Sequence, residues 1–272
     1  MIDSALEWTA IAPYGKHGSD DRHRVLAAAT QRMLDEARIG EGSHVLDVGT
    51  GTGDTTLLAA DRVGPSGRVV ATDTSATMLD AAAAAVRARG LTHVLVRAMD
   101  ASTVDMRPGT FDAVIARNVL MFVPVPRAVA GFHRLLRSGG RFAAVVWSTL
   151  ATNPYQRIVL EAARARGGWA EESPEIARAF SMGDADVYRR TLEGAGYREV
   201  DVHTVQTSWQ FASAAAALAA IRASAVHAEP IARLPERARE AAWSEVGGAL
   251  REFEREGGCE VPAESLVVVG EK

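Results

Sequence analysis

Residues 44–63 carry a short strand pattern, a glycine turn and a helix pattern with almost nothing between them. The strand, 44–48, leads into glycines at alternate positions, Gly49, Gly51 and Gly53. Glycine takes positive φ angles without strain and lets another group approach the backbone. The third glycine of such a turn also allows a helix to pack closely on a strand. This order of elements is typical of turns that bind nucleotide-like ligands, although a glycine turn by itself is equally compatible with a structural role.

Strand and helix patterns continue to alternate as far as residue 147. The expected strands are 68–73, 93–100, 111–118 and 138–147, and the expected helices are 22–38, 75–89 and 124–137. The strands are almost continuously apolar, which indicates burial on both faces, and the alternation predicts a parallel sheet with helices on both sides. Right-handed crossovers bring the carboxyl ends of such strands to one edge, where open α/β sheets bind ligands.

After Trp147 helical patterns dominate. Helices are expected at 153–167, 184–195, 211–225 and 235–256, and strands at 197–206 and 265–272, with Pro230 and Pro235 separating the last two helices. The sequence therefore predicts three parts. These are an N-terminal cover segment (1–21), an α/β core (22–207 with 259–272) and a helical lid (208–258) inserted between the last two strands.

Charge and composition argue against several classes of function. The formal net charge is −4 and the pI is about 6.0, so no basic field favours nucleic acid as a partner. One cysteine, Cys259, and histidines without metal-ligand spacing predict no disulfide and no metal site. The N-terminus lacks the pattern of a signal peptide, and no apolar run is long enough to span a membrane. We expect a cytoplasmic protein that does not act at a membrane.

Acidic residues end three successive expected strands: Asp47, Asp73 and Asp100. An unpaired carboxylate is costly at the buried end of a strand, so Asp47 calls for a cationic partner such as the ammonium of an amino-acid group. Asp73 is placed to accept two ribose hydroxyls. Asp100 is placed to accept an adenine amine while Met78 packs on the ring. The alternative is that Asp47 and Asp73 cap the helices that follow them and that Met78 is a core residue.

These motifs, with residues 111–116 (FDAVIA) and 139–142 (GGRF), resemble the class I S-adenosylmethionine (SAM)-dependent methyltransferases. The most similar group is the one related to ubiquinone and menaquinone biosynthesis enzymes. The likeness covers residues 22–148 and continues more loosely to the C-terminus. It implies a Rossmann-like, doubly wound sheet of seven mostly parallel strands with an antiparallel terminal strand. One departure is Ser138, where the family commonly has proline.

The resemblance also implies a cofactor site and a reaction. Asp47 and the glycine turn would hold the methionine part of SAM, Asp73 the ribose, and Asp100 the adenine, while Tyr14 would close over the cofactor. The full implied set is Tyr14, Asp47, Gly49, Thr50, Gly51, Thr52, Gly53, Asp73, Thr74, Met78, Asp100, Ala101, Arg117 and Asn118. The reaction would be an in-line transfer of methyl to O, N or C of a small-molecule acceptor in a closed pocket, as in small-molecule biosynthesis, leaving S-adenosylhomocysteine.

Two other functions are compatible with parts of the pattern. Nicotinamide dehydrogenases use the spacing Gly-x-Gly-x-x-Gly, but here the third glycine comes one residue early, and Asp47 would repel a pyrophosphate. A SAM-binding protein that no longer transfers methyl, such as a cyclase or a binding scaffold, would keep the same loop and acids. No motif identifies the acceptor or the oligomeric state.

A general base is needed only if the acceptor keeps its proton up to the transition state. His17, in a glycine-rich N-terminal segment, is the candidate, and His203 and His227 are further ones. Trp147, at the end of its strand, either lines the acceptor site or closes the edge of the sheet.

Overall fold

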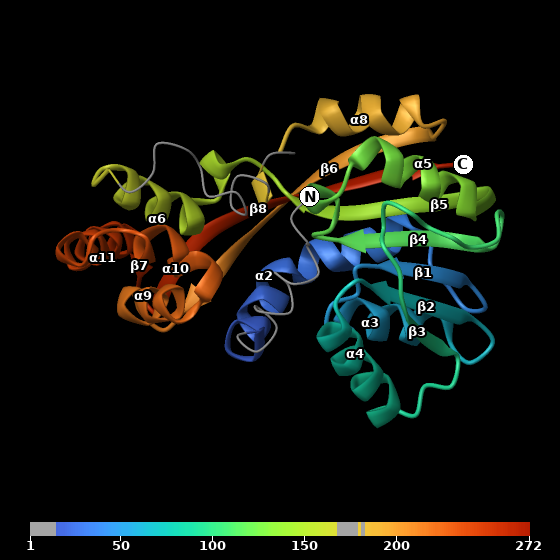
Figure 1. The fold of residues 1–272 in the computed structure, drawn as a ribbon, viewed down its shortest axis with the longest axis horizontal. Helices are drawn as coiled ribbons and strands as arrows, with labels where there is room; N and C mark the ends of the chain where they lie inside the picture. The colour runs from blue at the N-terminus through green and yellow to red at the C-terminus, as the bar shows by residue number, and fades with distance from the viewer. Residues whose placement is uncertain (1–14, 168–178, 181–182) are drawn as a thin grey trace.

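The structure is a computed structural model that describes residues 15–167, 179–180 and 183–272, with side chains from residue 21 onward except at Ala225. A twisted sheet runs through the molecule in the strand order β3-β2-β1-β4-β5-β8-β6 (Figure 1). The strands are β1 (His44–Val48), β2 (Arg68–Asp73), β3 (Val94–Ala98), β4 (Phe111–Arg117), β5 (Leu136–Trp147), β6 (Arg198–Phe211), β7 (Glu254–Arg255) and β8 (Gly258–Glu271). Strands β1 to β5 are parallel, and β8 is antiparallel to both β5 and β6. The expected α/β class with an antiparallel terminal strand is confirmed, and the short β7 pairs with β8 in addition.

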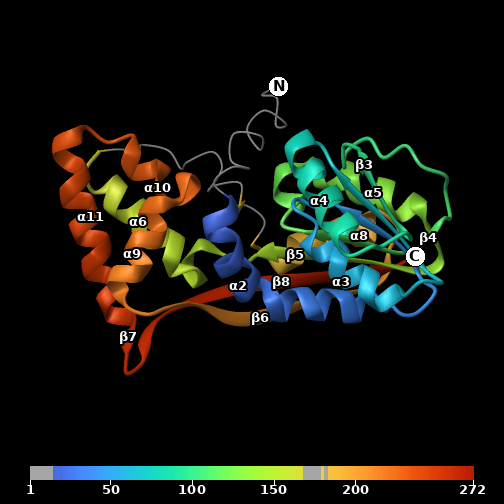
Figure 2. The same ribbon diagram turned by 90° about the horizontal axis from the view of Figure 1, so that it is seen from below.

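Helices cover both faces of the sheet. They are α2 (Gly15–Glu36), α3 (Asp54–Val63), α4 (Ala76–Ala88), α5 (Val125–Leu135), α6 (Pro154–Arg164), α8 (Ala185–Gly194), α9 (Ala214–Ala223), α10 (Ala225–Ala232) and α11 (Glu236–Leu250). Helices α2, α3 and α4 lie on one face and α5 and α8 on the other (Figures 1 and 2). Ion pairs join neighbours on the first face, Arg62 to Asp35 at 2.7 Å and Arg89 to Asp61 at 2.6 Å.

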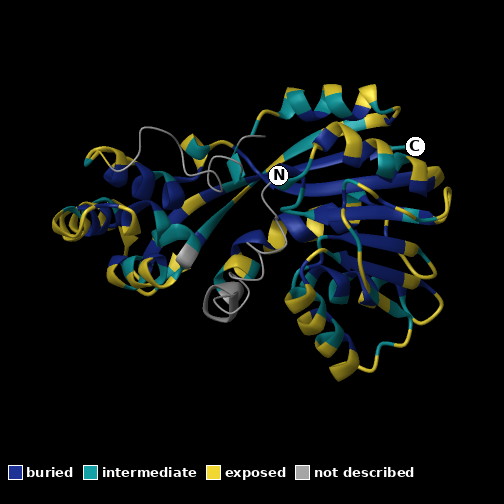
Figure 3. Ribbon diagram, viewed as in Figure 1, coloured by how far each residue is buried: buried dark blue, intermediate teal, exposed yellow. Residues whose placement is uncertain are grey.

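The core of the α/β part lies where β4, β5 and α5 meet. Phe132 and Phe142 are fully buried, and their rings stack with centroids 5.7 Å apart. The hydroxyl of Tyr197 donates to the carbonyl of Val129 at 3.0 Å, so this buried ring carries no unmet polar group. Figure 3 shows the central strands as the most continuously buried part of the ribbon, as expected for a sheet covered on both faces.

Strands β6 and β8 are each 14 residues long and extend past the other strands as a two-stranded ribbon (Figure 2). The ribbon carries α9, α10 and α11, and α6 packs against α10 and α11 although it lies much earlier in the chain. We call these four helices, with the ribbon beneath them, the helical unit. Its division from the core at residues 208 and 258 stays a prediction.

Two expectations for this region were wrong in detail. Pro230 lies inside α10 instead of separating two helices. The adjoining Ile231 and Leu234 are almost completely buried, so packing outweighs the cost of proline in this short helix. The last strand begins at Gly258 and not at residue 265, because its first half alternates buried and exposed residues instead of being continuously apolar.

Among the described residues, no helix combines the length and the apolar character that crossing a bilayer requires. Within the same part of the chain, no group of three or more His, Cys, Asp or Glu side chains is arranged to hold a metal ion.

We expect Phe132→Ala to lower the free energy of unfolding by about 3–5 kcal/mol, because it leaves a cavity under β5. Urea unfolding at pH 7.5 measures this. Leu95→Ala is the matched control, since Leu95 is 55% exposed on the edge strand β3, and its cost should stay below about 1 kcal/mol. Equal effects of the two substitutions would contradict the placement of the core.

Candidate functional site

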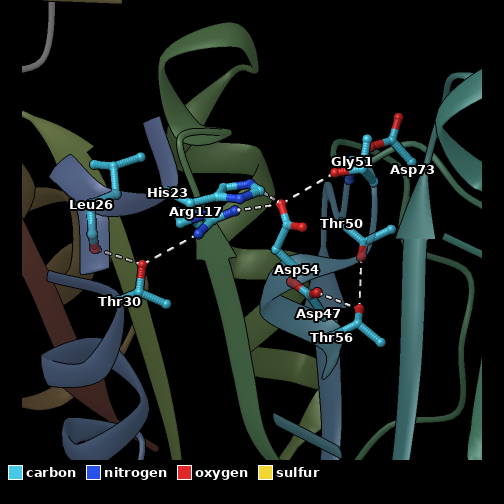
Figure 4. A network of polar contacts seen from close by, with 11 residues as sticks. His23, Leu26, Thr30, Asp47, Thr50, Gly51, Asp54, Thr56, Asp73 and Arg117 are labelled. Atoms are coloured by element: carbon cyan, nitrogen blue, oxygen red, sulfur yellow. Dashed lines mark hydrogen bonds and ion pairs between the residues drawn. The ribbon is translucent and has the colours of Figure 1, made fainter. Parts of the chain in front are cut away.

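The carboxyl ends of β2, β1 and β4 are neighbours, and hydrogen bonds connect the ends of β1, β2 and β3. The amide of Thr50 donates to the carbonyl of Thr72 at 2.8 Å. The amide of Gly51 donates to Asp73 Oδ2 at 2.9 Å, and Figure 4 shows these two residues side by side. The amide of Met99 donates to the carbonyl of Asp73 at 3.0 Å, which connects the turn after β3. The strand-end acids of the sequence prediction therefore lie along one edge of the sheet.

Asp47 is the most deeply buried of these acids, with 1% of its surface exposed. Its Oδ2 accepts a hydrogen bond from Thr56 Oγ1 at 2.6 Å, and the hydroxyls of Thr56 and Thr50 lie 2.7 Å apart. Its Oδ1 is buried and has no hydrogen-bond partner in the described structure. Burial raises the pKa of Asp47 to about 6, although the Thr56 hydrogen bond and the charge of Arg117 act in the opposite direction. One carboxylate oxygen is thus available to a cationic or hydrogen-bond-donating ligand group.

The three glycines of the turn serve different purposes. At Gly49, with φ +66°, a Cβ would lie 2.3 Å from Val119 Cγ2, so packing requires glycine there. At Gly51, with φ +57°, a Cβ would meet nothing within 4 Å, so this part of the turn is open to a ligand. A Cβ on Gly53 would lie 3.2 Å from the backbone of Ala82. The third glycine therefore lets the turn approach α4 closely; the nearest atoms belong to this helix and not to a strand, as had been expected.

Asp73 and Asp100 both make local hydrogen bonds. Asp73 Oδ1 accepts from the amide of Ser75 at 2.9 Å. Asp100 Oδ1 accepts from the amide and the hydroxyl of Ser102, both at 2.7 Å. Asp73 thus bonds the amide of Ser75, but the N-cap of α4 is Ser75 itself, whose hydroxyl accepts from the amide of Met78. Because a carboxylate has about four acceptor sites, these bonds leave acceptor capacity for a ligand, and both ligand roles stay predictions.

The remaining expected site residues are placed as follows. Ala101 is buried, Met78 and Thr52 are half-buried, and Thr74 is exposed. Asn118 has φ +57°, and its buried Oδ1 has no partner among the described residues. Tyr14 lies outside the described residues, and so does the side chain of His17, whose backbone belongs to the first turn of α2. The ring of His203 lies 3.2 Å from Arg32 and 3.3 Å from Glu36, and α2 carries both of these residues.

A polar network that the sequence did not reveal ties α2 to the glycine turn. Asp54, the first residue of α3, pairs with His23 of α2 and with Arg117 of β4, whose Nη2 lies 3.3 Å from Asp54 Oδ2 (Figure 4). Arg117 Nη1 also donates to Thr30 Oγ1 of α2 at 3.4 Å. Burial would raise the pKa of Asp54, but the hydrogen bond and charge of His23 and the charge of Arg117 outweigh it, and the pKa is lowered. Arg117 therefore binds Asp54 in this structure, and its expected ligand role stays a prediction.

A family profile described as a methyltransferase domain matches residues 45–140. The ubiquinone/menaquinone biosynthesis C-methyltransferase UbiE of Rubrivivax gelatinosus is 32% identical over 184 residues, which cover 64% of this chain and 70% of that protein. Nocamycin O-methyltransferase of Saccharothrix syringae is 40% identical over 112 residues, 41% of this chain and 40% of that protein. The match covers 46% of one further relative and 52% of another, so the chain spans about half the length of most of these proteins.

Among solved structures, phosphoethanolamine N-methyltransferase 2 of Haemonchus contortus in complex with S-adenosyl-L-methionine has a TM-score of 0.56. The superposition covers 90% of this chain and 52% of that one, at 15% sequence identity. At this level of identity the likeness shows the shared fold alone.

We expect Asp47→Asn to stabilise the ligand-free protein above pH 6. A native pKa of about 6 against an ordinary 3.8 means that the folded state bears a poorly solvated charge above pH 6, at a cost of about 3 kcal/mol. Well below pH 3.8 the carboxyl is protonated in both states and this cost disappears, and at pH 4 only a small part of it remains. Urea unfolding at pH 4 and pH 7.5 should show the variant gaining only at the higher pH, and Asp61→Asn, at an exposed position, should gain at neither. A variant less stable than the wild type at pH 7.5 would contradict the assignment.

Proposed function

The chain belongs to the class I SAM-dependent methyltransferase family, and we propose that it binds SAM at the carboxyl ends of β1, β2 and β4 and transfers methyl to a small molecule. The main support is the free Oδ1 of Asp47, a buried carboxylate oxygen without a partner beside an open turn at Gly51. The amino-acid end of SAM offers an ammonium, which would neutralise this carboxylate directly or through a water molecule.

We assign the other contacts by their position along the edge of the sheet. Asp73 would bind the ribose, and Asp100, Ala101 and Met78 would surround the adenine. The glycine turn, with Thr50 and Thr52, would follow the methionine chain, and Asn118 would bind its far end through the free Oδ1. Thr74, Arg117 and Tyr14 complete the set, with Tyr14 closing over the cofactor.

When SAM is bound, its sulfonium supplies an activated methyl group, so the protein does not have to generate a strong nucleophile. The residues of this chain would instead hold the acceptor atom in line with the methyl–sulfur bond, which is the main source of acceleration in such a transfer. Exclusion of water by the helical unit would strengthen the polar contacts. A SAM-binding protein that does not transfer methyl remains the second candidate, because the loop and the acids account only for binding.

Calorimetry with S-adenosylhomocysteine tests the binding site. We expect wild-type protein to bind it and Asp73→Ala to bind it about 100-fold more weakly, because two hydrogen bonds to a charged acceptor are lost. Asp61→Ala is the matched control, since Asp61 makes an exposed ion pair with Arg89, and it should bind like the wild type. Absence of binding by the wild type, or full affinity in Asp73→Ala, would refute the assignment.

A further inference from the structure

Aromatic side chains from three elements stack in a row that runs from the end of β5 into the helical unit. We call Trp147 of β5, Trp209 and Phe211 of β6, and Tyr155 of α6 the aromatic row. Trp147 and Trp209 have ring centroids 6.1 Å apart, Tyr155 and Trp209 4.5 Å, and Tyr155 and Phe211 5.7 Å, with interplanar angles of 25°, 15° and 11°. Rings held this nearly parallel favour a flat apolar partner that continues the stack.

His227 of α10 stands edge-on to the row. Its ring lies 5.2 Å from Tyr155 and 6.1 Å from Trp209, at interplanar angles of 88° and 86°. The residue is half-buried, so it still reaches solvent. Within the described residues no hydrogen bond engages its ring nitrogens. Burial and the charge of Arg22 lower the pKa of His227 to about 4, so the imidazole is neutral at pH 7 and keeps a nitrogen lone pair.

The start of α2 connects His227 to the cofactor edge. Figures 1 and 2 both show α10, which carries His227, beside the N-terminal half of α2. Burial and the charge of Arg22 lower the pKa of His227, and burial and Arg117 lower the pKa of Arg22, while Asp54 acts in the opposite direction. His23, the next residue, pairs with Asp54 beside the glycine turn. Figure 2 shows α2 lying between the helical unit and the α/β part. Consecutive residues of α2 thus act on His227 of the helical unit and on Asp54 beside the glycine turn.

The aromatic row also contains a buried polar group that lacks a hydrogen-bond partner. Trp209 is 4% exposed, and its Nε1–H has no hydrogen-bond partner in the described structure. Buried indole donors are usually bonded, so this one is available to an oxygen of a bound molecule.

We propose that the acceptor is a planar, conjugated molecule with an acidic hydroxyl, a phenol or an enol, which stacks against the aromatic row and gives its hydroxyl proton to His227. This proposal rests on the proposed function. In the transfer, the acceptor oxygen forms the bond to the methyl carbon. The carbon–sulfur bond breaks with its electron pair left on sulfur, and the O–H proton moves to a ring nitrogen of His227.

The positive charge of Arg22 favours a hydroxyl over an amine as the group that accepts the methyl. Aromatic rings also attract cations, but the guanidinium of Arg22 beside His227 repels a protonated amine and stabilises a developing oxyanion. A weakly basic imidazole takes a proton effectively only from an acidic donor, which excludes ordinary aliphatic alcohols.

The test compares His227→Gln with His44→Gln, a matched control because His44 is exposed at the amino end of β1, opposite the cofactor edge. The probes are 1,8-dihydroxyanthraquinone, 1-hydroxyanthraquinone and 2-naphthol, with unhydroxylated anthraquinone and phenethylamine for comparison. Calorimetry with S-adenosylhomocysteine, quenching of tryptophan fluorescence and mass spectrometry of the product are measured for each protein. Normal affinity for S-adenosylhomocysteine keeps the proposed function intact whatever the probes show.

We expect a hydroxylated probe to bind and be methylated, with methylation falling about 100-fold or more in His227→Gln and unchanged in His44→Gln. Both variants should bind S-adenosylhomocysteine like the wild type. Trp209→Phe should bind the probe but lose a large part of the quenching. Wild type that binds S-adenosylhomocysteine but none of the three hydroxylated probes, or a His227→Gln variant that methylates at the wild-type rate, overturns the proposal.

An independent variant tests the geometry without relying on activity. Arg22→Gln removes a cation that lowers the pKa of His227, so NMR titration of the His227 ring should show a higher pKa than in the wild type, and weaker binding of the hydroxylated probe. An unchanged pKa together with unchanged binding would place Arg22 away from His227 and overturn the proposed site.

Discussion

The candidate ligand site at the carboxyl edge of the sheet is centred on one buried carboxylate, that of Asp47. Asp47 ends β1 in the middle of the sheet, where an ionised group is expensive, and the surrounding structure satisfies only one of its oxygens. Thr56 and Thr50 fix the position of the carboxylate, and Gly51 keeps the space beside the turn open. A chain built for stability alone would place an apolar residue here, so the retained charge is best understood as a binding group whose cost a cationic ligand offsets.

Helix α2 joins this edge to the helical unit. Its side chains contact Asp54 at the start of α3 and Arg117 at the end of β4. The charge of Arg22, with burial, lowers the pKa of His227 in the helical unit. The helix also packs along β5, β6 and β8, so the sheet holds it in place. Two consecutive residues of α2 therefore act in different directions: His23 pairs with Asp54 beside the cofactor edge, and the charge of Arg22 acts on His227 of the helical unit.

The sequence predicted the part of the molecule in which local pattern and global fold agree. Continuous apolar runs gave β1, β2, β4 and β5, and the parallel order of these strands brought Asp47 and Asp73 to one edge. The second half was harder, because β8 alternates buried and exposed residues and Pro230 sits within a helix. No pattern in the sequence predicts the interactions of Asp54 and Arg22, because they join residues that lie far apart in the chain without a repeating spacing.

The difference in how well the two halves can be predicted follows from what each half has to bind. The cofactor edge is defined by backbone turns and strand-end acids, which local sequence specifies and which can stay the same whatever the acceptor. The ribbon of β6 and β8 supports the helical unit. Of these two strands, only β8 pairs with the parallel part of the sheet, at β5. Side chains on the outer half of the ribbon, such as Trp209 and Phe211, can therefore change without disturbing β1 or the glycine turn. A fold of this kind lets one methyl-donor site serve many acceptors, and the acceptor must be inferred from the arrangement of rings and charges in the helical unit.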